Sequence, residues 1–164
     1  MISSGAARPL SRPRPRCPPG PRRFEESGTE IMYLDKLREV CHTNVHRESR
    51  PGVGHHLTFT EELYDVDGNL VSTSEGMAVV YGDPADGSLM QLMTATEKLA
   101  DGTISWTGTV RQEDPNGTEF VVNSFPAIGV SGRYAGKTGT RTFKFVERPD
   151  EHTTICEATI YMED

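Results

Sequence analysis

The sequence lacks most of the features that identify common enzyme classes. Only three of its 164 residues are cysteine and one is tryptophan. Cys17, Cys41 and Cys156 are scattered and form no CxxC pair. This indicates reduced thiols and a cytoplasmic setting rather than a disulfide framework. No apolar run approaches the roughly 18 residues of a membrane-spanning helix, so no membrane partner is expected.

Motifs for nucleotide, metal and serine chemistry are also absent. There is no Walker loop, GxGxxG fingerprint or HExxH, and the GVSG at 129–132 falls short of a GxSxG elbow. His42 and His46 would share a helix face if 40–47 were helical, and Glu61 or Glu62 could then complete a metal site. No spacing typical of zinc ligands supports this alternative. We therefore expect no metal and no cofactor.

The first 28 residues differ in composition from the rest of the chain. They contain six of the 11 prolines and six arginines, against Glu25 and Glu26. Their local charge of +4, set against −7 for the whole chain, leaves −11 for the remainder. We expect a disordered tail at 1–28 and one folded domain at 29–164. The acidity of that domain disfavours a nucleic-acid partner.

Asx-Gly pairs between alternating segments predict an all-β fold. The pairs are Asp67-Gly68, Asp86-Gly87, Asp101-Gly102 and Asn116-Gly117. The segments that suit strands are 57–64, 74–82, 88–97, 103–112, 118–125, 139–147 and 153–162. Residues 29–41 fit either a helix or an eighth strand, and an eighth strand would close the sheet and remove its exposed edges. Seven or eight strands at this spacing predict a barrel or a sandwich, and an eight-stranded antiparallel β-barrel would be wide enough to be filled by side chains or to hold one small ligand.

The segment 129–145 (GVSGRYAGKTGTRTFKF) is the most informative of the chain. Its four glycines predict a tightly packed turn that leads into a strand. Arg141, Phe143 and Phe145 then share one face of that strand, with Thr142 and Lys144 on the other. Arg141 is therefore expected to point inward, where a buried guanidinium requires a partner.

Trp106 and one of the two glutamates at 61 and 62 are further candidates for the interior. Trp106 shares a face with Gly108, whose small size would leave space beside the indole and favours a cavity wall. Glu61 and Glu62 lie on opposite faces of one strand, so one of them can point inward, but we interpret them as rim or surface carboxylates.

The glycine pattern at 129–139 is followed by a strand in which aromatic and polar residues alternate. Together they resemble the allene oxide cyclase barrel family, whose barrel dirigent proteins share in outline. FTEELYD at 59–65 and FPAIG at 125–129 resemble, more closely, bacterial spirotetronate cyclases of the abyssomicin type, which are Diels-Alderases. The resemblance covers residues 29–148 and implies a homodimer. It implies an eight-stranded antiparallel β-barrel that starts with a strand at Thr29-Glu30-Ile31, so we interpret residues 29–41 as a strand. It also implies that Arg141 is the catalytic pocket arginine. The implied substrate-binding positions are Phe59, Met93, Trp106, Gln112, Phe125, Phe143 and Phe145.

This chain departs from the family at several of those positions. Met93 and Phe125 stand where the family has tyrosines, and Trp106 replaces a small residue, so the substrate is expected to differ. The activity implied is a cofactor-independent intramolecular [4+2] cyclisation of a linear, hydrophobic polyketide bearing a tetronate or tetramate head. The alternatives are a non-catalytic carrier barrel for a hydrophobic metabolite, an allene-oxide-cyclase-like isomerase, and a structural barrel with a filled interior.

Overall fold

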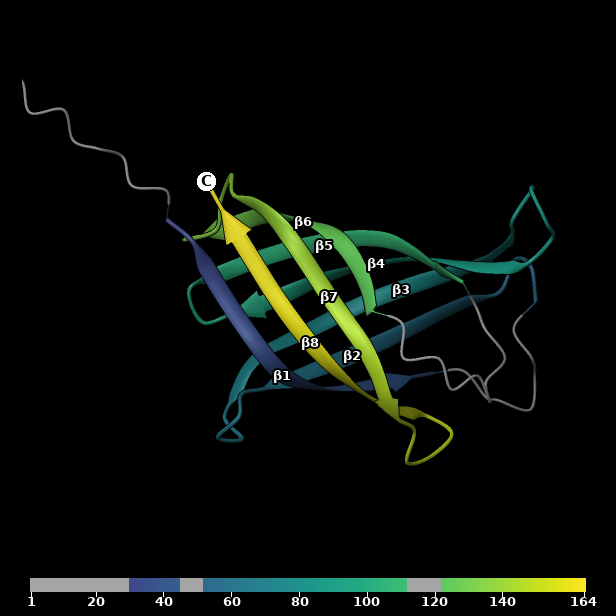
Figure 1. The fold of residues 1–164 in the computed structure, drawn as a ribbon, viewed down its shortest axis with the longest axis horizontal. Coiled ribbons are helices and arrows are strands. Elements are labelled where there is room, and N and C mark those ends of the chain that lie inside the picture. The colour runs from purple at the N-terminus through teal and green to yellow at the C-terminus, as the bar shows by residue number, and fades with distance from the viewer. Residues whose placement is uncertain (1–29, 45–51, 112–121) are drawn as a thin grey trace, which may run out of the picture.

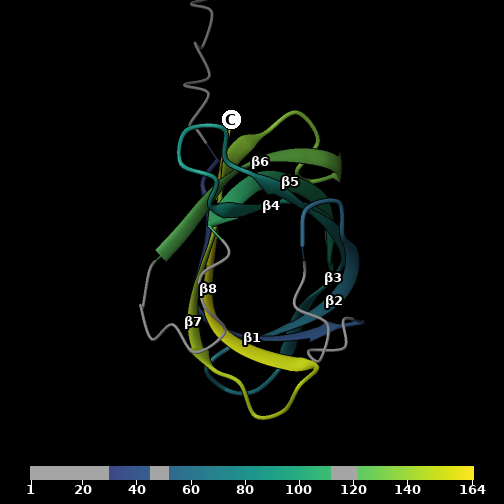
Figure 2. The same ribbon diagram turned by 90° about the vertical axis from the view of Figure 1, so that its right-hand side faces the viewer.

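A computed structural model describes residues 30–44, 52–111 and 122–164, and in these ranges it consists of antiparallel strands (Figure 1). Eight strands follow one another around a closed barrel, in which β8 pairs with β1 (Figure 2). The strands are β1 (Met32–Thr43), β2 (His56–Tyr64), β3 (Leu70–Gly82), β4 (Leu89–Leu99), β5 (Gly102–Arg111), β6 (Val122–Gly132), β7 (Thr138–Glu147) and β8 (Thr153–Glu163). No helix long and apolar enough to cross a bilayer occurs in the described ranges.

The predicted eight-stranded barrel is confirmed, and so is the choice of a strand for the ambiguous first segment. The pairs Asp67-Gly68, Asp86-Gly87 and Asp101-Gly102 lie at the connections that follow β2, β3 and β4. The pair Asn116-Gly117 lies outside the described residues, as does the predicted tail at 1–28.

The predicted strand at 118–125 differs most from the structure. Residues 118–121 lie outside the described ranges, and β6 continues to Gly132. The extension forms because Ile128 and Gly129 still pair with Ser105 and Ile104 of β5, so a glycine-rich sequence that suggests a turn remains in the sheet.

The turn between β6 and β7 packs tightly against the strand that precedes it. A Cβ atom on Gly129 would lie 1.5 Å from the carbonyl oxygen of Tyr134, so only glycine fits there. Gly129 N also donates a hydrogen bond of 2.8 Å to the carbonyl of Lys137. The buried ring of Tyr134 belongs to the hydrophobic core. The packed turn predicted from the four glycines is therefore present.

The two ends of the barrel are distinguished by their connections. We call the end with the β2–β3, β4–β5 and β6–β7 connections the turn end, and the opposite end the loop end (Figure 1). Near the turn end, the inward side chains of Leu63, Ile104 and Met162 are fully buried. Near the loop end, Val110 and Phe143 are only half-buried. Half-buried Val71 and Leu99 also lie near the turn end, and buried Val80 lies near the loop end, so burial alone does not distinguish the two ends.

Candidate functional site

Arg141 lies at the centre of a charged cluster inside the barrel. Its side chain is 0% exposed. Nη2 donates to Glu39 Oε2 at 2.7 Å, and Nε donates to Glu97 Oε1 at 3.3 Å. Nη1 donates to the carbonyl oxygen of Thr142 at 2.7 Å. Glu61 Oε2 completes the cluster, 3.7 Å from Nη2. The guanidinium thus has the partners that a buried cation requires.

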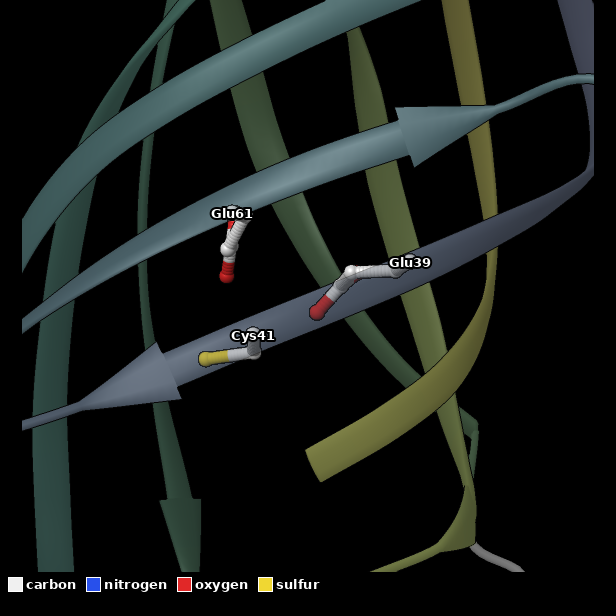
Figure 3. A group of neighbouring side chains, drawn as sticks. All are labelled: Glu39, Cys41 and Glu61. Atoms are coloured by element: carbon white, nitrogen blue, oxygen red, sulfur yellow. The ribbon is translucent and has the colours of Figure 1, made fainter. Parts of the chain in front are cut away.

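Strand register explains why the three carboxyl groups meet. Cys41 on β1 pairs with Glu61 on β2, Glu61 pairs with Ser74 on β3, and Ser74 pairs with Glu97 on β4. Directly paired residues share a face of the sheet, so all of these side chains point inward. Glu39 lies two residues before Cys41 and takes the same face. Figure 3 shows Glu39, Cys41 and Glu61 approaching one another inside the barrel.

The cluster contains more carboxyl groups than one cation can balance. Burial, with a further contribution from the charge of Glu39, raises the pKa of Glu61 from its ordinary value of 4.5 to about 8. Burial also raises the pKa of Glu97. For Arg141, burial alone would lower the pKa, but the carboxylates outweigh it and raise the pKa above its usual range. Arg141 therefore stays charged, and Glu61 is mostly protonated at neutral pH.

A series of aromatic rings lines the interior beside this cluster. Trp106 stacks with Phe59, at a distance of 6.1 Å between ring centroids, and with Phe125, at 5.3 Å. Phe125 in turn meets the edge of Phe143, also at 5.3 Å. Arg141 Cζ lies 5.8 Å from the centroid of the Trp106 ring. We call Phe59, Trp106, Phe125 and Phe143 the aromatic wall; it runs from the buried centre to a half-buried ring near the loop end.

The space expected beside Trp106 is not vacant. A Cβ atom on Gly108 would lie 2.0 Å from Cδ1 of Phe125, so the Phe125 ring occupies the volume that the missing side chain leaves. The prediction that Gly108 leaves a gap next to the indole is therefore wrong. Gly108 instead allows Phe125 to stack on Trp106.

The remaining predicted binding residues lie toward the loop end or outside the described ranges. Met93 is half-buried and packs against the core. Phe145 is half-buried, and Arg148 Cζ lies 5.5 Å from its ring centroid. Gln112 lies outside the described residues.

The carboxyl groups are the part of the site that the sequence analysis missed. The interpretation of Glu61 as a rim or surface carboxylate is wrong, because its side chain is 3% exposed. Glu62 does lie on the outer face, where it accepts a hydrogen bond from Tyr64. Glu39 and Glu97 were not singled out, although each alternates with apolar residues in the same way as Arg141.

Three of the inward groups are close enough to be considered as metal ligands. One ligand atom from each of Glu39, Cys41 and Glu61 lies within 4.8 Å of the others. However, the guanidinium of Arg141 already supplies the positive charge at this point, and burial raises the pKa of the Cys41 thiol, which keeps it protonated. These donors suit Arg141 better than a metal ion. His42, considered for a metal site with Glu61 or Glu62, is exposed, and His46 lies outside the described residues.

The fold and the cluster define a small, closed antiparallel barrel with a charged and aromatic interior. The chain belongs to the allene oxide cyclase barrel like family, whose model matches residues 39–156.

Solved structures support the same fold. One, described as a nonspecific heme-binding cyclase that catalyses [4 + 2] cycloaddition during neoabyssomicin biosynthesis, aligns with a TM-score of 0.70 and 20% identity over 82% of this chain and 64% of the other. The Diels-Alderase AbmU from Streptomyces koyangensis aligns with a TM-score of 0.68 and 20% identity, over 80% of this chain and 63% of the other. The exo-specific intermolecular Diels-Alderase AbnU aligns with a TM-score of 0.68 and 24% identity, over 84% of this chain and 99% of the other. This chain thus spans less than two thirds of the length of the first two.

Proposed function

We propose that this protein is a cofactor-independent cyclase that holds a linear, hydrophobic polyketide in the folded shape required for an intramolecular [4+2] cycloaddition. The aromatic wall carries this proposal. It gives a rigid, largely apolar surface that begins at a buried polar cluster and ends at a half-buried ring. The [4+2] activities described for structures of the same fold support the choice of reaction. The same proposal includes a homodimer in the cytoplasm, which light scattering and cell fractionation test.

The reaction suits a site of this kind because it requires no proton shuttle. Its barrier falls when a diene and a dienophile are held in contact, and orientation can contribute up to about 7–11 kcal/mol in well-aligned intramolecular reactions. Phe59, Trp106, Phe125 and Phe143, with Met93 and Phe145 nearer the loop end, would form the surface that selects the folded conformer.

Arg141 is the residue proposed to act on a substrate oxygen. A guanidinium has five N–H groups, and three of them donate to Glu39, Glu97 and Thr142. Arg141 therefore retains donor capacity for an enone or tetronate oxygen whose negative charge grows in the transition state. The surrounding carboxyl groups weaken its electrostatic effect, so conformational control is expected to contribute more than charge stabilisation.

The test uses a linear trienone in which a tether joins a diene to an enone. The purified protein is expected to increase the rate of cycloadduct formation and to change the diastereomer ratio. Phe143→Ala is expected to lower the rate enhancement about 10-fold or more, because without this ring of the aromatic wall the substrate can also bind in unproductive conformations. Val146→Ala is the matched control, since Val146 is exposed on the same strand. Equal rates and ratios with and without protein would contradict the proposal.

One observation favours a non-catalytic carrier barrel as the second candidate. The Arg141 charge is already balanced by carboxyl groups, so the guanidinium does not depend on a reacting oxygen for a partner. A carrier is expected to bind the cycloadduct as tightly as the linear trienone and to leave the cyclisation rate unchanged. Calorimetric titration with both compounds, alongside the rate measurement, separates the two functions.

A further inference from the structure

The indole N–H of Trp106 is a buried donor without a partner. Three buried side-chain atoms in the described ranges have no hydrogen bond, namely Ser72 Oγ, Ser88 Oγ and Trp106 Nε1. Of these, Trp106 alone belongs to the site, where its ring is 1% exposed and adjoins Arg141. Buried donors are nearly always paired, and an unpaired one carries a desolvation penalty. An acceptor supplied by a ligand would remove that penalty.

The surroundings of the indole restrict what the acceptor can be. Phe59 and Phe125 stack on the ring and Arg141 Cζ lies over it, whereas the indole N–H points along the ring plane, so an acceptor must approach at the edge. The neighbouring cluster contains one guanidinium and three carboxyl groups. An anion placed there would meet carboxyl groups that exceed the available positive charge, so a neutral oxygen is favoured over a carboxylate or an enolate.

We propose that Trp106 Nε1 donates a hydrogen bond to a neutral carbonyl oxygen of the substrate, with the carbonyl conjugated to the alkene that reacts. This inference rests on the proposed function and narrows its substrate class from tetronate or tetramate anions to neutral enones, esters or amides. It assigns a polar role to a residue that stands where the resembling family has a small side chain.

The hydrogen bond would assist the reaction without transferring a proton. In the cycloaddition, two carbon–carbon σ bonds form as two π bonds are consumed, and the indole proton stays on nitrogen. The carbonyl withdraws more electron density from the alkene when its oxygen accepts a hydrogen bond, and the bond strengthens as negative charge grows on the oxygen. Trp106 would thus contribute through a bond that gains strength in the transition state.

The single tryptophan makes the test direct, because the indole N–H gives one resonance in the full-length protein labelled with nitrogen-15. Three probes share a phenylpropenyl skeleton: benzylideneacetone carries a neutral ketone, cinnamate a carboxylate, and β-methylstyrene no oxygen. The ketone is expected to move the resonance downfield and to saturate. The hydrocarbon is expected to bind without that downfield movement, and cinnamate to bind more weakly than the ketone at pH 8.

Affinity in variants gives a second measurement. Trp106→Phe keeps a ring but removes the donor, and it is expected to weaken ketone binding about 2- to 10-fold more than it weakens hydrocarbon binding. The control, Thr109→Ala, alters an exposed residue of the same strand. If Trp106→Phe does not fold, the resonance of the unaltered protein still decides.

The outcomes separate this inference from the proposed function. An indole resonance that stays in place on saturation with the ketone, or no ketone binding at all, overturns the inference. Cinnamate binding more tightly than the ketone overturns the restriction to neutral carbonyls. If the ketone moves the resonance but the trienone is not cyclised faster, the inference on the donor stands and the proposed catalysis fails.

Discussion

The three carboxyl groups around Arg141 predict an unusual dependence of stability on pH. Glu61 is the group to perturb, because its pKa rises from 4.5 to about 8 in the folded protein. The groups that face it are Glu39 and Cys41 from β1, Glu97 from β4 and Arg141 from β7, and Ser74 Oγ of β3 donates to Glu61 Oε2 at 2.5 Å.

The sign of the effect follows from proton binding. Between the two pKa values the unfolded chain has released the Glu61 proton and the folded protein still holds it, so unfolding releases a proton. The free energy of unfolding therefore falls as pH rises from about 5 to about 8, by at most about 1.4 kcal/mol per pH unit. The whole loss from this group is at most about 5 kcal/mol, and the raised pKa of Glu97 acts in the same direction.

The assay is urea unfolding, followed by the fluorescence of Trp106, at a series of pH values in this window. Glu61→Gln removes the titration and can retain the contact with Ser74, so its stability is expected to vary less with pH and to exceed that of the unaltered protein near pH 8. Glu62→Gln, on the outer face of the same strand, is the matched control and is expected to keep the original slope. Equal slopes in the unaltered protein and Glu61→Gln would refute the reasoning.

Two further substitutions test the packing of the site. Arg141→Met leaves three buried carboxyl groups without a cation and is expected to lower the free energy of unfolding by about 3–5 kcal/mol in urea titrations; a loss below about 1 kcal/mol would contradict the ion cluster. Gly108→Ala places a methyl group where Phe125 now stacks on Trp106, and is expected to cost about 1–3 kcal/mol and to change the near-ultraviolet circular dichroism. Gly52→Ala, with no atom within 4 Å of the added Cβ, is expected to leave both measurements unchanged.

The fold was predictable because local signals agree along most of the chain. Period-two alternation and three Asx-Gly pairs mark the strands and turns, and both are properties of short segments. The limit of β6 at Gly132 was not predictable in this way, because pairing with β5 keeps a glycine-rich segment in the sheet.

The site was predictable only in part, for a reason visible at Arg141. Alternation with Phe143 and Phe145 indicates that its side chain points inward, but the partners come from β1, β2 and β4, more than 40 residues away along the chain. Which carboxyl groups face the guanidinium depends on the closure of the barrel and on register. Glu39 and Glu97 also share a strand face with apolar residues, as Arg141 does. The rule that such a charged residue points inward, applied to acidic as well as basic residues, would have identified both glutamates.

The cluster also allows folding and function to be separated. Buried ion groups are often no more stabilising than apolar side chains of similar volume, whereas breaking one of them is costly. Replacing all four residues together, as Arg141→Met, Glu39→Leu, Glu61→Met and Glu97→Leu, is therefore expected to recover most of the stability lost in Arg141→Met alone. Cyclisation of the trienone is expected to stay impaired in both variants, because neither has the polar cluster beside the aromatic wall. Urea unfolding and the rate assay measure the two properties independently. A fourfold variant less stable than Arg141→Met would mean that the cluster holds the barrel together, and one that cyclises the trienone at the original rate would mean that the aromatic wall alone performs the reaction.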